Sequence, residues 1–251
     1  MTYKYELDGT TWQPGSQYIY DFTFNENVIT VTTNILDWGD GGTILDPDPA
    51  NGHAYVDLGL RRNGNKILFA TMNIGASAPE NYGDFFAWGE TSRRYNSFYE
   101  PGFNFVQSNA PFYDGSSYTK YNNTDSKLTL DKEDDIASIM WGGNWRMPDK
   151  EDFEYLLNST YCTTQLVGDC ALFTGKGDFV GNSILLPCNQ GFAYDRSLQM
   201  MDEESEYYTR SRFESNPDKA YVLDFWYGTG SIISGGRVIG CNIRPVLEIP
   251  E

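Results

Sequence analysis

The chain has 251 residues, of which 35 are acidic and 18 are basic, giving a formal net charge of −17 at pH 7. This balance excludes nucleic acid as an expected partner, because phosphate binding needs a cationic surface, and it disfavours an anionic membrane surface for the same reason. No apolar run approaches the roughly 20 residues that span a bilayer, so membrane insertion is not expected. Residues 1–5 lack the apolar segment of a signal peptide, so none is expected in this chain.

Residues 1–45 are predicted to form β structure. The stretches 18–24 and 28–35 are rich in aromatic and β-branched residues and flank a polar turn at 25–27, a pattern that predicts a hairpin. Two strands alone are only marginally stable. We therefore expect this segment to pack on another domain or to be the end of a larger sandwich.

Residues 46–53 contain two prolines and are predicted to be a linker, in which the single histidine, His53, is exposed to solvent. Residues 54–251 are predicted to form the main domain. Its first element is a hairpin of strands at 55–60 and 66–70, joined by an Asn-Gly-Asn turn.

Two helices are predicted around a segment rich in tryptophan and glycine at 141–148. The first covers 130–140, where apolar residues recur at helical spacing. The second follows Asp149, which is expected to cap it together with Asp152 three residues later. Short strands are predicted at 183–187, 207–209, 220–225, 231–233 and 241–246. These elements predict an α+β domain.

The four cysteines, Cys162, Cys170, Cys188 and Cys241, form no CxxC pair, so structural zinc is not expected. Their pairing in disulfides is left open. With His53 alone, neither a histidine-based catalytic triad nor a histidine-rich metal site can be built. No cofactor is therefore predicted, although loop carboxylates leave calcium open as a ligand.

Five spaced motifs resemble those of one family. They are YVDLGL at 55–60, ATMNIGA at 70–76, YGDFFAWGE at 82–90, WGGNWRMP at 141–148 and GCNIRPV at 240–246. In this order they resemble the Fibrobacter-type major paralogous domain, which is similar to the formylglycine-generating-enzyme branch of the C-type lectin fold. The resemblance covers residues 54–248. It implies a compact α+β domain with two short helices, small antiparallel sheets, paired terminal strands and irregular loops over one face.

Two arginines, Arg146 and Arg244, lie within these motifs. Arginine is rarely buried without a partner. We therefore expect both to pair with core acids such as Asp84 or Glu90.

Residues 1–45 resemble the last strands of fimbrillin-like pilus subunits, in which a Gly-x-x-Tyr-x-Tyr strand leads to an Asp-Trp pair. Here these features are residues 15–20 and the pair Asp37 and Trp38. The resemblance implies a pilin-like segment that carries a lectin-fold module, as in a pilus tip adhesin, with other pilus subunits as partners. A generic hairpin is the alternative.

Residues 207–240 are predicted to carry a recognition face, because they mix aromatic, small polar and β-branched residues as adaptable binding surfaces do. The predicted contact residues are Arg212, Phe213, Trp226, Tyr227, Thr229, Ser231, Ile233, Ser234, Arg237 and Val238. Strand alternation is expected to turn about half of them toward the core. Similar proteins of gut bacteria and their phages are targets of diversity-generating retroelements in this stretch, which implies a diversified binding surface.

These features favour a non-enzymatic, adhesin-like module that binds a host or bacterial surface protein or a glycan. Its expected location is the cell surface or the outside of the cell, on a pilus or a phage particle. One alternative is an enzyme of the formylglycine-generating type, in which Cys188 and Cys241 are the candidates for holding copper. The other is a structural pilus subunit.

Overall fold

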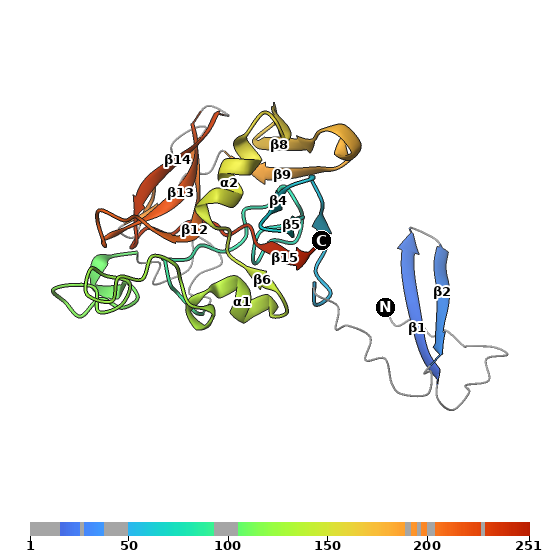
Figure 1. Cartoon of the computed structure of the whole chain (residues 1–251), viewed down its shortest axis with the longest axis horizontal. Helices are drawn as coiled ribbons and strands as arrows, with labels where there is room; N and C mark the ends of the chain where they lie inside the picture. The colour runs from blue at the N-terminus through green and yellow to red at the C-terminus, as the bar shows by residue number, and fades with distance from the viewer. Residues whose placement is uncertain are drawn as a thin grey trace. The chain divides into compact units, whose positions relative to one another are not determined.

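In this computed structural model, the structure is described for residues 16–25, 28–37, 50–92, 105–188, 192–194, 197–199, 204–226 and 229–251. The chain divides into two compact units, Met1–Pro47 and Asp48–Glu251 (Figure 1). The division falls within the predicted linker. Among the described residues, no helix has the length and apolarity needed to cross a membrane.

The first unit contains one hairpin. Strands β1 (Ser16–Asn25) and β2 (Val28–Asp37) pair antiparallel, with Tyr20 opposite Thr33. Their aromatic and β-branched residues favour extended backbone. The predicted hairpin is confirmed. Two residues of the pilin-like pattern, Gly15 and Trp38, lie outside the described residues.

The second unit is built around a five-stranded sheet in the order β3-β5-β15-β6, with β4 pairing to β5. Its strands are β3 (Tyr55–Val56), β4 (Arg61–Arg62), β5 (Asn65–Ala70), β6 (Trp145–Arg146) and β15 (Val246–Pro250). The antiparallel pairing of β5 with β15 joins the two ends of the domain, as predicted.

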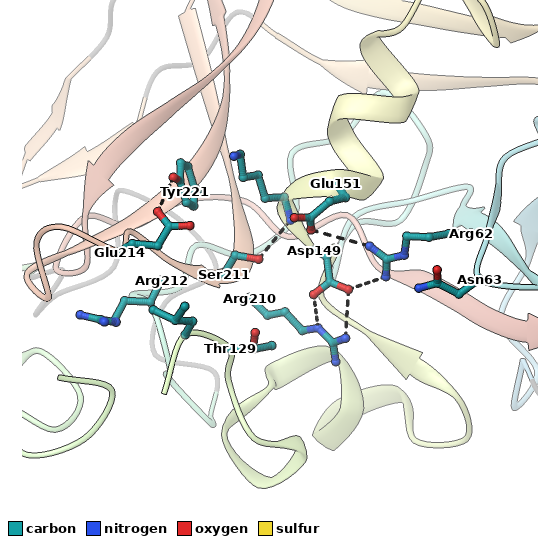
Figure 2. Close-up of a pocket in the computed structure, with 12 residues that line it drawn as sticks. Arg62, Asn63, Thr129, Asp149, Glu151, Arg210, Ser211, Arg212, Glu214 and Tyr221 are labelled. Atoms are coloured by element: carbon teal, nitrogen blue, oxygen red, sulfur yellow. Dashed lines mark hydrogen bonds and ion pairs between the residues drawn. The ribbon is translucent and has the colours of Figure 1, made fainter. Parts of the chain in front are cut away.

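Two α-helices flank strand β6. Helix α1 (Ile136–Trp141) is shorter than predicted, because a 3-10 turn (Lys132–Asp134) takes the place of its first residues. Helix α2 (Lys150–Leu157) begins directly after its N-cap, Asp149, which Figure 2 shows at the start of the helix. Asp149 and Asp152 form the expected capping box. The side chain of Asp149 accepts the backbone N–H of Asp152, and the side chain of Asp152 accepts the backbone N–H of Asp149.

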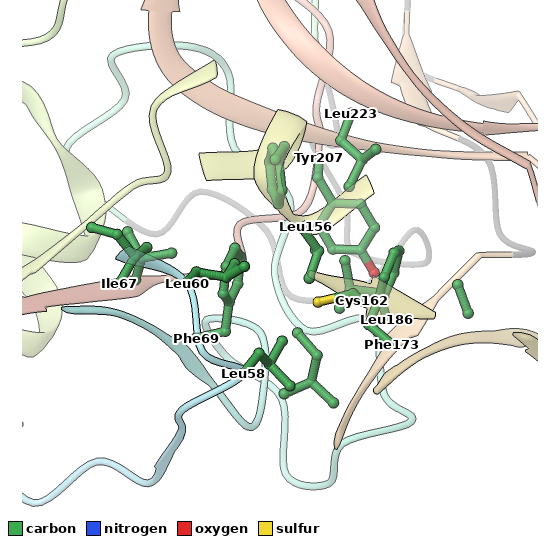
Figure 3. Packing of buried hydrophobic residues seen from close by; sticks show 14 of the residues in the cluster. Leu58, Leu60, Ile67, Phe69, Leu156, Cys162, Phe173, Leu186, Tyr207 and Leu223 are labelled. Carbon is green, nitrogen blue, oxygen red and sulfur yellow. The ribbon is translucent and has the colours of Figure 1, made fainter. Parts of the chain in front are cut away.

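Alternate residues of β5 point to opposite sides of the sheet and so join different clusters. Ile67 and Phe69 lie in an apolar cluster that includes Leu156 of α2 (Figure 3). Leu68 lies in a second cluster with Trp145. The sheet is therefore buried on both faces.

Two three-stranded antiparallel sheets complete the described part, in the orders β7-β8-β9 and β12-β13-β14. Their strands are β7 (Cys162–Val167), β8 (Cys170–Gly175), β9 (Ser183–Pro187), β12 (Glu204–Arg212), β13 (Lys219–Trp226) and β14 (Thr229–Gly236); β10 (Phe192–Tyr194) and β11 (Ser197–Gln199) form a further hairpin. Helix α2 lies between the two sheets (Figure 1) and contacts both. Two short helices and several small antiparallel sheets are compatible with the predicted α+β class.

The predicted strand at 241–246 needs correction. Regular pairing begins only at Val246, the first residue of β15. Before it, Cys241 forms an isolated bridge with Phe86. The backbone there is extended but pairs with separate segments rather than with one strand.

The end of the predicted linker also needs correction, because residues 50–53 pack on the second unit. The side chain of Ala50 is buried, and its carbonyl accepts the indole N–H of Trp145 at 2.6 Å. His53 is not a solvated linker residue: its ring stacks on Trp141, with centroids 3.9 Å apart and planes 5° apart.

Both motif arginines are buried, but their partners differ from those predicted. Arg146 donates to Asp152 Oδ2 and to Glu248 Oε2, each at 2.6 Å. Arg244 donates to Asn73 Oδ1 at 2.7 Å and also to backbone carbonyls, among them that of Leu185 at 2.8 Å. A guanidinium has five N–H donors and so can satisfy carbonyls that strand pairing leaves open. Burial lowers the pKa of Arg244 to about 10.

Candidate functional site

The β12-β13-β14 sheet carries most of the predicted contact residues. Residues directly opposite each other in antiparallel strands lie on the same face. One face is therefore formed by Glu206, Tyr208, Val222, Asp224, Trp226, Thr229, Ser231 and Ile233, and we call it the Trp226 face. The other face carries Tyr207, Leu223 and Phe225, which are buried in the cluster that contains α2 residues.

The Trp226 face is closed at one end and open at the other. Tyr208 and Val222 are buried in a cluster with Ile239. Toward the β13-β14 turn and the β14 edge, Trp226 is 48% exposed and Ile233 is 40% exposed. Exposed large apolar side chains on one face can be buried against a binding partner.

Four predicted contact residues meet on the exposed part of this face. They are Trp226, Thr229, Ser231 and Ile233. Ser234 lies on the opposite face, across from Tyr221, and Val238 follows β14; both are partly buried. Tyr227 lies outside the described residues.

Arg237 was expected to contact a ligand, and this prediction is wrong, because its side chain is 0% exposed. Its guanidinium lies 3.9 Å from the ring centroid of Tyr118 and 4.6 Å from that of Trp88. It also donates to the carbonyls of Tyr121 and Pro217. A delocalised, weakly hydrated guanidinium is suited to burial between aromatic rings. Burial lowers the pKa of Arg237 to about 10.

Arg212 and Phe213 lie at the end of the sheet away from Trp226. Arg212 is buried and donates to the carbonyl of Lys127 at 3.1 Å, so it holds the loop around Lys127 rather than facing solvent. Phe213 packs edge-on against Tyr221, with centroids 5.3 Å apart. These two residues are thus separated from the exposed part of the Trp226 face.

Two acids that the sequence did not single out lie in the middle of the Trp226 face. Glu206 and Asp224 stand opposite each other on β12 and β13, and both are buried. Asp224 is 8% exposed, and its Oδ1 has no hydrogen-bond partner among the described residues. Burial raises the pKa of Asp224. The sequence feature that could have predicted this buried acid is an aspartate within an apolar strand, two residues before Trp226.

Replacing Asp224 with asparagine should raise the free energy of unfolding at pH 7 by roughly 1 kcal/mol, because it removes a poorly compensated buried charge. The pKa of this carboxyl in the folded chain lies above its ordinary 3.8. The wild-type chain is therefore stabilised as the pH falls through the folded pKa toward 3.8, whereas the variant is not. Urea titrations at several pH values check this. The difference between the free energies of unfolding of the variant and the wild type should become smaller in acid. A difference that stays constant with pH would contradict the prediction.

One acid cluster has the spacing of a cation site. Carboxylate oxygens of Asp131, Glu133 and Asp134 lie within 4.8 Å of one another. The ammonium of Lys120 already pairs with them, at 3.1 Å from Asp131 and 3.9 Å from Glu133 and in contact with Asp134. This internal cation weakens the case for calcium at that position.

The four cysteines are buried and form no disulfide. Cys162 and Cys170 belong to the paired strands β7 and β8. Cys188 and Cys241 lie in different apolar clusters, and the thiol of Cys241 donates to Glu206 at 3.5 Å. The geometry therefore does not favour a metal site shared by Cys188 and Cys241.

Comparison with protein-family models, with curated proteins and with solved structures finds no match to this chain.

Proposed function

We propose that Asp48–Glu251 is a non-enzymatic ligand-binding module that holds a surface protein or glycan on the Trp226 face. The observation that carries the proposal is the exposed row of Trp226 and Ile233, with Thr229 and Ser231 between them. Tryptophan is the residue most enriched among those that dominate binding energies, and small hydroxyl residues beside it supply hydrogen bonds.

The scaffold beneath this row supports such a role. The opposite face of the sheet is fixed against α2: a Cβ added to Gly230 would lie 2.5 Å from Leu157. A binding surface whose strands cannot shift loses little conformational entropy when a ligand docks. The exposed side chains are therefore presented on a sheet that packs closely against α2.

The same proposal includes the fold and the carrier. Two short helices and the pairing of β5 with β15 support a C-type lectin-like domain. The motifs that resemble the Fibrobacter-type domain support a surface location, on a pilus or a phage particle, with the first unit as a pilin-like attachment. An experimental structure compared with lectin-fold domains would test the fold.

Replacing Trp226 with alanine should weaken ligand binding by at least about thirtyfold, because truncating a central aromatic contact commonly costs 2 kcal/mol or more. Ligands are first selected with the full chain on protein and glycan arrays. Affinities are then measured for the selected ligand with the wild type and the variant. Since Trp226 is half exposed, its loss should leave the free energy of unfolding nearly unchanged.

Val180→Ala is the matched control, because Val180 is 71% exposed and lies beyond the β7-β8 hairpin, outside the Trp226 face. It should bind as the wild type does. Equal affinity of the Trp226 variant and the wild type for every selected ligand would overturn the proposal.

A further inference from the structure

A polar pocket of about 490 Å³ lies where the start of α2 meets β12 and the β4-β5 turn (Figure 2). It is formed by segments far apart in the chain, including Asn63, Asp149, Ser211 and Tyr221. Its volume falls in the range of about 300–1,000 Å³ that is typical of small-molecule sites. Tyr221 lies five positions before Trp226 on β13, so this pocket is distinct from the exposed row on the Trp226 face.

The floor of the pocket is a closed ion-pair network. Asp149 accepts from Arg210 through both oxygens, at 2.6 and 3.0 Å, and from Arg62 at 2.5 Å (Figure 2). These guanidinium groups overcome the effect of burial and lower the pKa of Asp149 to about 2. The charges of the floor are thus neutralised within the protein.

Most of the remaining charges of the wall are also paired within the chain. Glu214 accepts the Tyr221 hydroxyl at 2.5 Å. Lys150 lies 4.6 Å from the Tyr221 ring centroid and 3.3 Å from Glu154. Arg212, which also lines the pocket, donates instead to the carbonyl of Lys127. Because cations and acids are both present and most of them pair with one another, the pocket offers no strong field of one sign. Recognition there must depend on hydrogen bonds more than on charge.

Hydrogen-bonding capacity remains at the mouth. The amide of Asn63 is exposed and offers both donors and an acceptor. The Ser211 oxygen accepts the backbone N–H of Lys150 at 3.1 Å, which leaves its own O–H to donate. The second carboxylate oxygen of Glu214 can accept. Leu128, which is 43% exposed, adds an apolar patch to this polar wall.

We infer that this pocket binds a neutral saccharide. Sugar hydroxyls both donate and accept, so they match a wall that carries both kinds of group, and the C–H face of a sugar ring fits against Leu128. A phosphate or sulfate would meet Arg62 and Arg210 where Asp149 already neutralises them, and would lie near the carboxylate of Glu214. This site goes beyond the proposed function, since it does not use the Trp226 face.

The test titrates the full chain with a panel of neutral disaccharides, and with uronate-bearing and sulfated disaccharides for comparison, by saturation-transfer NMR and calorimetry. Neutral members should bind, with affinities that change little with salt. The double variant Asn63→Gly with Glu214→Ala should bind about ten- to a hundredfold more weakly, since two hydrogen-bonding groups are lost. Glycine suits position 63, where φ is +52°.

Glu133→Ala is the matched control, because this acid is 73% exposed and does not line the pocket. Trp226→Ala should also keep saccharide binding, so that failure of this inference and failure of the proposed function are distinguishable. Any of three results would overturn the inference: no panel member bound at about 10 mM, preference for the charged disaccharides with steep salt dependence, or unchanged affinity in the double variant.

Discussion

Replacing Arg146 with methionine should lower the free energy of unfolding by about 3 kcal/mol, because buried Asp152 and half-buried Glu248 then keep only Arg62 as a nearby cation. Arg146 joins Asp152 Oδ2 and Glu248 Oε2, each at 2.6 Å. Asp152 is fully buried, and its other oxygen, which accepts no hydrogen bond among the described residues, lies 3.2 Å from Arg62. Methionine keeps much of the volume of arginine, so the loss reports the charge. Urea unfolding followed by tryptophan fluorescence measures it.

The control is Arg61→Met. Arg61 also pairs with an acid, Asp57, at 2.9 Å, but both side chains are about a quarter exposed. Exposed pairs contribute about 0–1 kcal/mol, so this variant should remain close to the wild type. Similar small decreases in the free energy of unfolding of the two variants would show that the ion pairs of Arg146 do not stabilise the motif at 141–148.

Replacing Gly83 with alanine should lower the free energy of unfolding by about 2–4 kcal/mol. Gly83 has φ +76°, and an added Cβ would lie 2.2 Å from the carbonyl oxygen of Ile74. That oxygen is fixed, because it accepts the N–H of Asp84 at 2.8 Å. The variant thus combines left-handed backbone strain with a clash against backbone that cannot move.

Gly64→Ala separates these two effects. Gly64 has nearly the same φ, +77°, but no atom lies within 4 Å of an added Cβ. Only the backbone strain of about 1–2 kcal/mol applies there. In thermal and urea unfolding, the Gly83 variant should therefore have a clearly lower free energy of unfolding than the Gly64 variant. Equal decreases in the two variants would show that the contact with Ile74 relaxes without cost.

The features that the sequence predicted correctly are local ones. The capping box of Asp149 and Asp152 needs residues three apart, and the β1-β2 hairpin needs two β-rich stretches around one turn. The pairing of β5 with β15 is long-range, and the motif resemblance supplied it.

The features that the sequence did not predict depend on contacts between distant segments. Arg237 is buried because Trp88 and Tyr118 come from other parts of the chain and enclose it. The Glu206–Asp224 pair depends on the register of β12 with β13, which residue patterns alone do not define. The polar pocket likewise forms only when the β4-β5 turn meets α2 and β12.

The measurement that most directly tests the binding role is hydroxyl-radical footprinting of the full chain, with and without a ligand selected on the arrays. The proposed function predicts protection of Trp226 and Ile233 on ligand binding, with the oxidation of Val180 unchanged. Protection elsewhere, with Trp226 oxidised as fast in the complex as in the free chain, would contradict it.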